Sequence, residues 1–316
     1  MKQIWKSLIR TVLFFLCAGL MVVSVSGALR VHGLTDSGYF KQPVNSLDTV
    51  YIGSCHFYST IMPSRVDAIA GTNSYLAGGV NMTARVMYYY LKATLERQHP
   101  KTVFLDSFAF TIHDSYVDPE VLGTCERRNI ADLPLLDRIK LIVEEIRLNR
   151  DMNAIYYAMD ISSFHENWIY FSNFGADNLS EDHGWKEYGT SQMERPGDLL
   201  QCGIVAENTS NLREDDLVYL EKILDLAERE GTEVIFISVP YEITEPEAEQ
   251  MNSFRSILEE RNVEWLDFTQ NEWLSKTDFR RGYMNDANHT NRKGAEVISD
   301  WLGRFLMNRN GTQKSE

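Results

Sequence analysis

Short apolar runs, rich in β-branched and aromatic residues, recur along the chain between polar segments. They occupy the ranges 49–53, 74–78, 102–106, 233–239 and 263–268. Continuous apolar runs of this length are typical of strands that are buried on both faces, as in a parallel sheet. The pattern therefore predicts five strands of one largely parallel sheet.

Helical spacing of apolar residues lies between or after these runs, at about 82–98, 213–231, 245–261 and 291–308. Gly231 stands between a predicted helix and a predicted strand, where glycine commonly ends a helix. Alternating strands and helices predict a three-layer α/β/α sandwich with a mostly parallel, flavodoxin-like sheet. Such sheets bind ligands at the carboxyl ends of their strands.

The chain divides into an anchor, a linker, a large domain and a tail. We expect a cytoplasmic tip and membrane anchor at 1–30, a linker at 31–47, the α/β/α domain at 48–308 and a polar tail at 309–316. The interval between the third and fourth strands is too long for a simple crossover. We therefore expect an insertion at about 107–212, with helical and aromatic-rich stretches, over the ligand-binding edge of the sheet.

The N-terminal segment contains an apolar run that is long enough to span a bilayer. No charged residue occurs from Thr11 to Leu29, and three basic residues precede the run: Lys2, Lys6 and Arg10. The positive-inside rule places the N-terminus in the cytoplasm and the domain outside the membrane. The alternative is secretion after cleavage of a signal peptide, because the small residues of "SVSGA" are suited to a peptidase.

Charge limits the classes of partner. The net charge is −14, and because residues 1–30 hold four basic groups and no acid, the remainder carries −18. A body this acidic argues against nucleic acid, whose binders present basic surfaces. The sequence has neither the dense His and Cys spacing of a metal site nor a glycine-rich phosphate loop, so we expect no metal and no cofactor.

Two short motifs could together form a catalytic site. The first predicted strand ends in Gly53-Ser54-Cys55, which places a thiol and a hydroxyl at the expected ligand-binding edge. Asp286 and His289 stand three residues apart, ahead of the last predicted helix. A carboxylate in this position can hold one imidazole nitrogen while the other faces a nucleophile. Cys55 is the favoured nucleophile, and Ser54 is the alternative.

These motifs resemble those of the SGNH (GDSL-type) hydrolases and acyltransferases, over roughly residues 46–110 and 213–308. Gly53-Ser54-Cys55 matches the first block of that family, Gly78 or Gly79 the second, and Asp286-x-x-His289 the last. The ending "DFRRGYMNDANHTNRKGA" is similar to that of the membrane-anchored bacterial branch, which includes proteins that transfer D-alanine to teichoic acids.

The chain departs from the family pattern in two places. Cys55 aligns with the attacking serine, so a thiol replaces the hydroxyl. The third block, Gly-x-Asn-Asp, is missing, and "VFLDSFAF" stands in its place, where Ser107 offers a substitute oxyanion donor. The other expected oxyanion donors are the main-chain N–H groups of Cys55 and of Gly78 or Gly79. We expect the start of a helix and the nearby His289 to lower the pKa of the Cys55 thiol.

The resemblance implies acyl transfer or ester hydrolysis on an acylated cell-envelope glycan or polymer, through a thioester on Cys55. It also implies a membrane-bound acyltransferase as a partner. The alternative is a catalytically inactive relative of the family that binds or assembles envelope material, because the serine and the third block are both lost.

Three cysteines lie beyond the N-terminal apolar run: Cys55, Cys125 and Cys202. In an oxidising compartment an odd number suggests one disulfide and one free thiol. A Cys125–Cys202 disulfide would leave Cys55 free. Two unpaired, buried cysteines are the alternative.

Overall fold

The computed structural model describes residues 2–29, 38–111, 119–158, 160–164, 206–276 and 282–313. Five parallel strands form one sheet in the order β2-β1-β3-β4-β5. The strands are β1 (Thr49–Gly53), β2 (Ser74–Gly78), β3 (Thr102–Asp106), β4 (Glu233–Ser238) and β5 (Glu264–Asp267). All five fall within the predicted ranges, and the parallel pairing confirms the predicted sheet.

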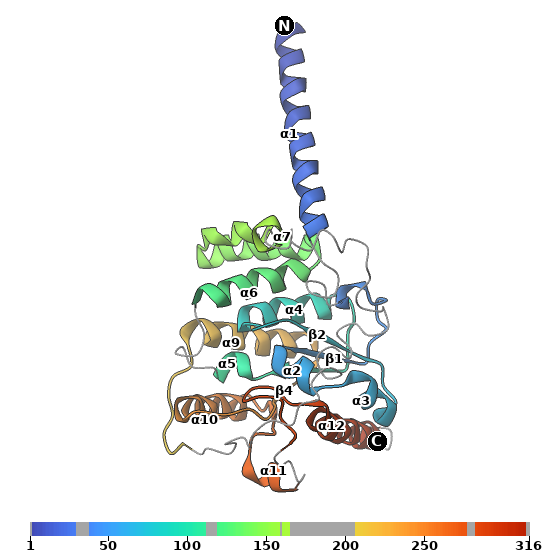
Figure 1. Ribbon diagram of the computed structural model, residues 1–316, viewed down its shortest axis with the longest axis vertical. Coiled ribbons are helices and arrows are strands. Elements are labelled where there is room, and N and C mark those ends of the chain that lie inside the picture. The colour runs from blue at the N-terminus through green and yellow to red at the C-terminus, as the bar shows by residue number, and fades with distance from the viewer. Residues whose placement is uncertain are drawn as a thin grey trace.

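Helices cover both faces of the sheet, which confirms the predicted α/β/α sandwich (Figure 1). Alternate strand residues point to opposite faces. Val50 and Ile52 pack in the cluster that contains α4 (Ala84–Leu95) and α9 (Glu214–Glu230). Tyr51 packs in the opposite cluster, against α12 (Arg292–Gln313). The fourth helix predicted from the helical spacing of apolar residues, at about 245–261, corresponds to α10 (Glu245–Glu260).

Several local features explain where the helices begin and end. Thr83 caps α4 by accepting a hydrogen bond from the N–H of Val86. Thr244 and Glu247 form a capping box at the start of α10. Gly231 ends α9 with a φ of 64°, which confirms the predicted glycine C-cap. These short-range signals set the lengths of the helices that pack on the sheet.

Short helices surround the main layers. Two of them, α2 (Cys55–Thr60) and α3 (Pro63–Ala70), follow β1 and were not predicted. Between β3 and α9, residues 119–158 and 160–164 are almost entirely helical, residues 206–213 contain no helix, and one further short helix lies between β5 and α12. These elements are α5 (Phe108–Thr111), α6 (Pro119–Asp132), α7 (Leu135–Glu144), η2 (Glu145–Asn149), η3 (Met152–Ala158), α8 (Asp160–Phe164) and α11 (Asn271–Lys276), with η1 (Tyr39–Lys41) ahead of β1.

Helix α1 (Lys2–Leu29) projects from one end of the domain (Figure 1). Its segment Gln3–Ser26 is long and apolar enough to cross a membrane. This is compatible with both a membrane anchor and a signal sequence. Leu29, at the end of α1, is 4% exposed and packs in one cluster with Ala131 of α6 and Phe164 of α8.

Candidate active site

The strand order reverses between β1 and β3, and the first motif lies at this point. In open α/β sheets, ligands bind in the crevice at the carboxyl ends of strands where the order reverses. Ser54 directly follows β1 and is the N-cap of α2, because its Oγ accepts a hydrogen bond from the N–H of His56. Cys55 is therefore the first residue of α2, at the expected edge of the sheet.

Asp106 fixes this turn from the neighbouring strand. Its Oδ2 accepts hydrogen bonds from the N–H of Ser54 (3.0 Å) and the Oγ–H of Ser54 (2.6 Å). Its Oδ1 accepts one from the N–H of Phe108 (3.0 Å). Burial raises the pKa of Asp106 to about 6, although these hydrogen bonds act in the opposite direction. The Ser54 hydroxyl is thus occupied by Asp106, which argues against Ser54 as the nucleophile.

Gly53 allows β1, β3 and α2 to approach closely. A Cβ atom at this position would lie 2.5 Å from Cγ of Phe57 and 2.7 Å from Cβ of Asp106. Neither distance is tolerable for a carbon atom. A side chain at residue 53 would therefore displace the turn that carries Cys55.

Asp286 and His289 are joined by several hydrogen bonds in the loop that precedes α12. Nδ1 of His289 lies 2.9 Å from Oδ1 and 3.1 Å from Oδ2 of Asp286. Oδ1 of Asp286 also accepts the N–H groups of Asn288 (2.8 Å) and His289 (2.9 Å). Partial burial alone would raise the pKa of Asp286, but these hydrogen bonds and the His289 ring outweigh it and lower the pKa. The pairing predicted from the D-x-x-H spacing is thus present.

The same loop is attached to α2 and to α12. The hydroxyl of Thr290 donates a hydrogen bond to the carbonyl of Ser59 (2.8 Å) and contacts the hydroxyl of Thr60 (3.0 Å). Oδ1 of Asn291 accepts the N–H groups of Lys293 and Gly294 at the start of α12. These bonds hold His289 at a fixed position relative to α2.

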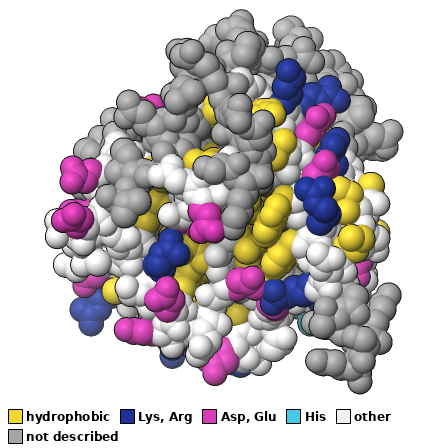
Figure 2. Space-filling model, turned by 90° about the horizontal axis from the view of Figure 1, so that it is seen from below, with side chains coloured by type: hydrophobic (Ala, Val, Ile, Leu, Met, Phe, Trp, Pro, Cys, Tyr) yellow, Lys and Arg dark blue, Asp and Glu magenta, His cyan; other side chains and the backbone are white. Residues whose placement is uncertain are grey.

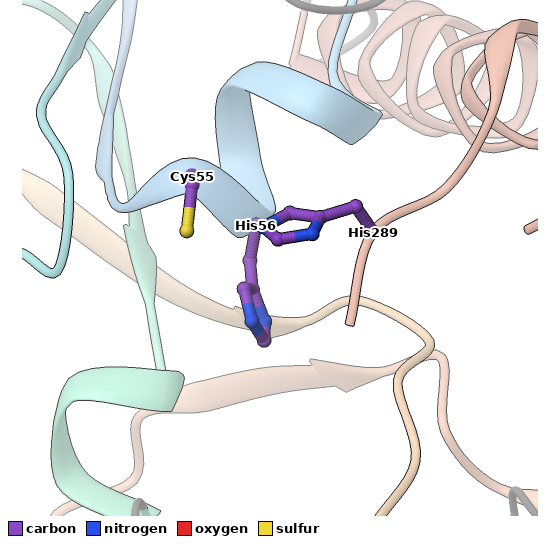
Figure 3. A group of neighbouring side chains, drawn as sticks. All are labelled: Cys55, His56 and His289. Atoms are coloured by element: carbon purple, nitrogen blue, oxygen red, sulfur yellow. The ribbon is translucent and has the colours of Figure 1, made fainter. Parts of the chain in front are cut away.

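Cys55 and His56 extend from α2, and His289 reaches toward them from the loop before α12 (Figure 3). The sulfur of Cys55, one ring nitrogen of His56 and one ring nitrogen of His289 all lie within 4.8 Å of one another. Because Asp286 holds Nδ1 of His289, Nε2 is the nitrogen that is left to face a nucleophile. The two segments that the sequence paired, some 230 residues apart, therefore do meet in space.

The thiol is not activated in the resting structure, which contradicts the expectation of a lowered pKa. Burial of the sulfur and the nearby charge of Asp106 raise the pKa of Cys55 to about 11. Hydrogen bonds from the main-chain N–H groups of Asn81, Cys55 and His56 act in the opposite direction but do not prevail. Helix α2 is only six residues long, so its N-terminus offers little to offset burial.

His56 is a second imidazole in the site, and it is buried. It is 1% exposed and stacks on Phe108 with 3.8 Å between ring centroids. Burial and the neighbouring His289 lower the pKa of His56 to about 3, so it is neutral at physiological pH. Its Nδ1 has no hydrogen-bond partner among the described residues. A buried polar atom without a partner is costly, and such atoms cluster at functional sites.

The expected oxyanion donors are only partly where the sequence placed them. The N–H of Gly79 donates to the carbonyl of Gly53 (3.1 Å), and Gly78 pairs with Gly53 in the sheet. In the loop that follows β2, the main-chain N–H of Asn81 is the donor directed at the Cys55 sulfur. Ser107 uses its N–H and its hydroxyl on the carbonyl of Ile237, so it does not replace the missing asparagine of the third block.

The loop at 79–81 is held by α6. Nδ2 of Asn129 donates to the carbonyl of Val80 (2.9 Å), and a Cβ at Gly79 would lie 2.0 Å from Oδ1 of Asn129. Asn81 adopts a φ of 45°, which is uncommon for a residue other than glycine. Strained backbone of this kind often marks a functional position. The glycine at 79 thus permits the contact with Asn129 rather than supplying a donor.

The expected Cys125–Cys202 disulfide stays a prediction. Among the described residues Cys125 forms no disulfide, and the amide nitrogen of Asn81 lies 4.0 Å from its sulfur. Burial raises the pKa of Cys125. Cys202 lies outside the described residues.

The three converging side chains also form a donor set that suits a thiophilic cation. Cys55, His56 and His289 offer one sulfur and two nitrogens, and Asp286 holds His289 as carboxylates often hold metal-bound histidines. Around bound zinc, with bonds of about 2.0–2.3 Å, such atoms would lie closer together than 4.8 Å. Binding would therefore require the side chains to move inward.

Three residues of this site were not identified from the sequence. Asp106 ends a predicted strand, and a carboxylate directly after an apolar strand is the available signal. His56 adjoins the nucleophile, and its part in the site depends on the turn of α2. Asn81 contributes its main chain, which leaves no signal in residue type beyond the glycines before it.

Comparison with known proteins gives little further information. No protein-family model matches the chain, and no curated protein matches it. One solved structure that resembles the chain is described as "a putative lipolytic protein of G-D-S-L family" from Desulfitobacterium hafniense DCB-2. The sequence identity is 12%, the match covers 81% of this chain and 97% of the other, and the TM-score is 0.41. Likeness at this level does not establish shared chemistry.

Proposed function

We propose that the chain is an acyl-ester hydrolase or acyltransferase of SGNH type that uses Cys55 as its nucleophile. One observation carries the proposal: the Cys55 sulfur and a ring nitrogen of His289 lie within 4.8 Å, while Asp286 is hydrogen-bonded to Nδ1 of the same ring. This is the arrangement of a nucleophile, a base and a group that orients the base.

The raised pKa of Cys55 determines how the reaction would begin. Because the resting thiol keeps its proton, His289 takes that proton as the sulfur attacks an ester carbonyl. A sulfur–carbon bond forms, and the negative charge on the carbonyl oxygen is stabilised by main-chain N–H groups near the sulfur, with Asn81 and Cys55 as the candidates. The carbon–oxygen bond then breaks, and the proton passes from His289 to the departing alcohol.

The resulting thioester would transfer its acyl group in the second half of the reaction. A hydroxyl, an amine or a water molecule gives its proton to His289 and attacks the thioester, and Cys55 leaves as a thiol. An acylated cell-envelope glycan or polymer is the proposed substrate, and a membrane-bound acyltransferase is the proposed source of acyl groups. The proposed location, outside the cell membrane and anchored by α1, is consistent with both.

The test uses the full chain in lipid nanodiscs with p-nitrophenyl acetate as the acyl donor. We expect release of nitrophenol and an acetyl group on Cys55, seen by peptide mass spectrometry and removed by hydroxylamine. Cys55→Ala removes the adduct, and His289→Ala slows its formation by about 10²–10⁴-fold. Cys125→Ala is the matched control and leaves the rate unchanged. Acetylation at Ser54, or equal rates in the wild type and His289→Ala, would sink the proposal.

A second candidate is a binding or assembly protein that keeps the fold without catalysis. The observation that favours it is the raised pKa of Cys55, because an unactivated thiol is a poor nucleophile. In that case the wild type and Cys55→Ala bind O-acetylated peptidoglycan or D-alanylated teichoic acid equally well, and neither releases the acyl group. Turnover by the wild type alone would exclude this candidate.

A further inference from the structure

The segment α7–η2–η3 presents an apolar surface to solvent. Eight of its large apolar side chains are at least 46% exposed. Single exposed apolar residues are ordinary, but a dense group on one segment marks an interaction surface. We name this group the α7–η3 face; it consists of Leu135, Leu136, Ile139, Val143, Leu148, Met152, Ile155 and Tyr156.

The α7–η3 face is the outer side of an amphipathic segment whose inner side is well packed. Leu135, Leu136, Ile139 and Val143 follow helical spacing along one side of α7. The opposite side is buried in the domain through Arg138, Leu141, Glu145 and Ala154. The segment is therefore held by the domain, and its exposed apolar residues are not needed to attach it.

The charges on the segment are segregated. Its three fully exposed charged residues, Lys140, Arg147 and Arg150, are all basic. Lys140 pairs with Glu96, whereas Arg147 and Arg150 form no ion pair with the described residues. The acidic side chains of the segment are turned inward, where each contacts a residue of the domain: Asp137 with Arg97, Glu144 with Lys92, Glu145 with Tyr89, and Asp151 with Arg85.

This combination is unusual for a chain with a net charge of −14. An apolar stripe with basic residues and without exposed acids is typical of helices that lie in a membrane interface and contact anionic headgroups. The end of the domain away from α1 also shows hydrophobic side chains, but acidic and basic side chains are interspersed around them (Figure 2). The α7–η3 face thus has the chemistry of a lipid-contacting surface rather than of ordinary domain surface.

The position of the α7–η3 face agrees with this chemistry. In Figure 1, α7 lies at the end of the domain from which α1 projects. Leu29 at the end of α1 packs with Ala131, which lies four residues before the start of α7. The uncharged run Thr11–Leu29 is 19 residues long, or about 28 Å as a helix, close to the ~30 Å hydrocarbon core. If α1 spans the bilayer, its point of attachment to the domain therefore lies at the headgroup layer.

We propose that the α7–η3 face rests in the headgroup layer of the membrane that α1 enters. Its apolar side chains reach the upper acyl chains, and Arg147 and Arg150 contact anionic lipid phosphates. This inference rests on the proposed anchoring by α1 but not on the proposed catalysis. With two contacts, at α1 and at the α7–η3 face, the domain has a fixed tilt, so the site at Cys55 faces its substrate at a constant height above the lipid.

Three native methionines allow a test without any substitution. Met152 on the α7–η3 face is 65% exposed, Met307 on α12 is 46% exposed, and Met21 on α1 is 68% exposed. The full chain is placed in nanodiscs of phosphatidylcholine and phosphatidylglycerol, and hydroxyl radicals are generated in the water. Mass spectrometry then gives the oxidation rate of each methionine. Exposure in the protein alone predicts that Met152 is oxidised faster than Met307. Contact with lipid predicts the reverse order, with Met152 protected together with Met21.

Each pattern of oxidation has one meaning. Protection of Met21 with rapid oxidation of Met152 overturns the lipid contact and leaves the anchor intact. Rapid oxidation of both overturns the anchor and the proposal that rests on it. Since the scaffold belt at the rim is the only other protein in a nanodisc, a surface that binds only a specific membrane-protein partner gives the first of these patterns. None of these results depends on whether the protein turns over an ester.

A matched pair of variants tests the same surface by disrupting its contact with lipid. Val143→Glu puts a negative charge on the α7–η3 face, and Val218→Glu puts one on α9, where Val218 is 44% exposed. We expect Val143→Glu to increase the oxidation of Met152 in nanodiscs and Val218→Glu to leave it unchanged. Equal oxidation in both variants, at the rate of the wild type, would count against the proposal.

Discussion

Two buried carboxylates in this protein lie in opposite electrostatic situations. Glu145, at the turn after α7, is 0% exposed and accepts hydrogen bonds from Tyr89, Tyr219 and Asn149. Burial would raise the pKa of Glu145, but these bonds and the charge of Arg85 outweigh it, and the pKa is lowered. Among the described residues, Asp106 accepts hydrogen bonds only from Ser54 and Phe108, and burial raises its pKa to about 6.

The two carboxylates differ in how completely their surroundings are hydrogen-bonded. Around Glu145, three side-chain donors and a cation compensate the cost of burying the charge. Near Asp106, Nδ1 of the buried, neutral His56 has no hydrogen-bond partner among the described residues, and the pKa of the Cys55 thiol is raised. A site that is incompletely satisfied in the absence of ligand is one in which a substrate can complete the hydrogen bonding.

Breaking the Glu145 network should give the largest effect. Removing one member of a buried, charge-paired network leaves its partners unsatisfied, so we expect Glu145→Ala to lower the free energy of unfolding by about 3–5 kcal/mol. Urea unfolding followed by circular dichroism measures this. The matched control is the neighbouring Glu144→Ala, which removes a half-buried pair with Lys92 and should cost about 0–1 kcal/mol. Equal losses would mean that the Glu145 network is not the stabilising element.

The pH dependence of stability should separate Asp106 from His56. The folded pKa of Asp106 lies above its ordinary value of 3.8, so its contribution is present at low pH and is lost, by about 3 kcal/mol, as the pH rises through about 6. The folded pKa of His56 lies below its ordinary value of 6.5, so its contribution is present above pH 6.5 and is lost as the pH falls toward about 3.

The two contributions have opposite signs, and single variants should expose each of them. Relative to the wild type, Asp106→Asn gains stability as the pH rises from 4 to 7, whereas His56→Gln loses stability over that range. Unfolding titrations at several pH values measure the two differences. Parallel curves for both variants would show that neither group has the pKa that its burial implies.

The thiol should react slowly at neutral pH. Since burial raises the pKa of Cys55 to about 11, its alkylation by iodoacetamide should increase with pH until well beyond the ordinary value of 9.0. Peptide mass spectrometry follows Cys55 and Cys125 separately, and free glutathione in the same solution supplies the reference. A midpoint below 8.5 for Cys55 would restore the preformed thiolate that the sequence suggested, and the reaction would then begin with an ion pair.

A thiophilic cation should have the smallest effect. If Cd²⁺ draws Cys55, His56 and His289 together, it binds only the folded state and raises the melting temperature modestly. Cys55→Ala should abolish the rise, and Cys125→Ala should preserve it. The rise should also be reversed by a chelator. A shift of the same size in the wild type and Cys55→Ala would place the cation elsewhere.

The fold was largely predictable because buried parallel strands leave continuous apolar runs. The range 49–53 matches β1 at both ends, and 263–268 contains β5. Helix α2 escaped prediction because six residues are too few to show helical periodicity. Its first turn depends instead on the cap at Ser54 and on Asp106, which is 52 residues away.

The sequence predicted the parts of the candidate site that depend on neighbouring residues in the chain. It did not predict the properties that depend on burial. Asp286 and His289 interact within one loop, so their spacing revealed the pair. The pKa of Cys55 could not be inferred, because the sequence does not show how deeply the sulfur is buried or that Asp106 lies nearby. Asn81 was missed for a related reason, since its contribution is a main-chain N–H in an unusual conformation.

The hydrogen bonds from Thr290 to the last residues of α2 have a mechanical consequence. They make the helix that begins with Cys55 and the loop that carries His289 a single rigid body. The 79–81 loop is held separately, by Asn129 of α6, so a displacement of that loop would leave the contacts between α2 and the His289 loop in place. Access to the Cys55 sulfur and the distance from that sulfur to His289 therefore depend on different segments. The first depends on the 79–81 loop and the second on α2 and the His289 loop.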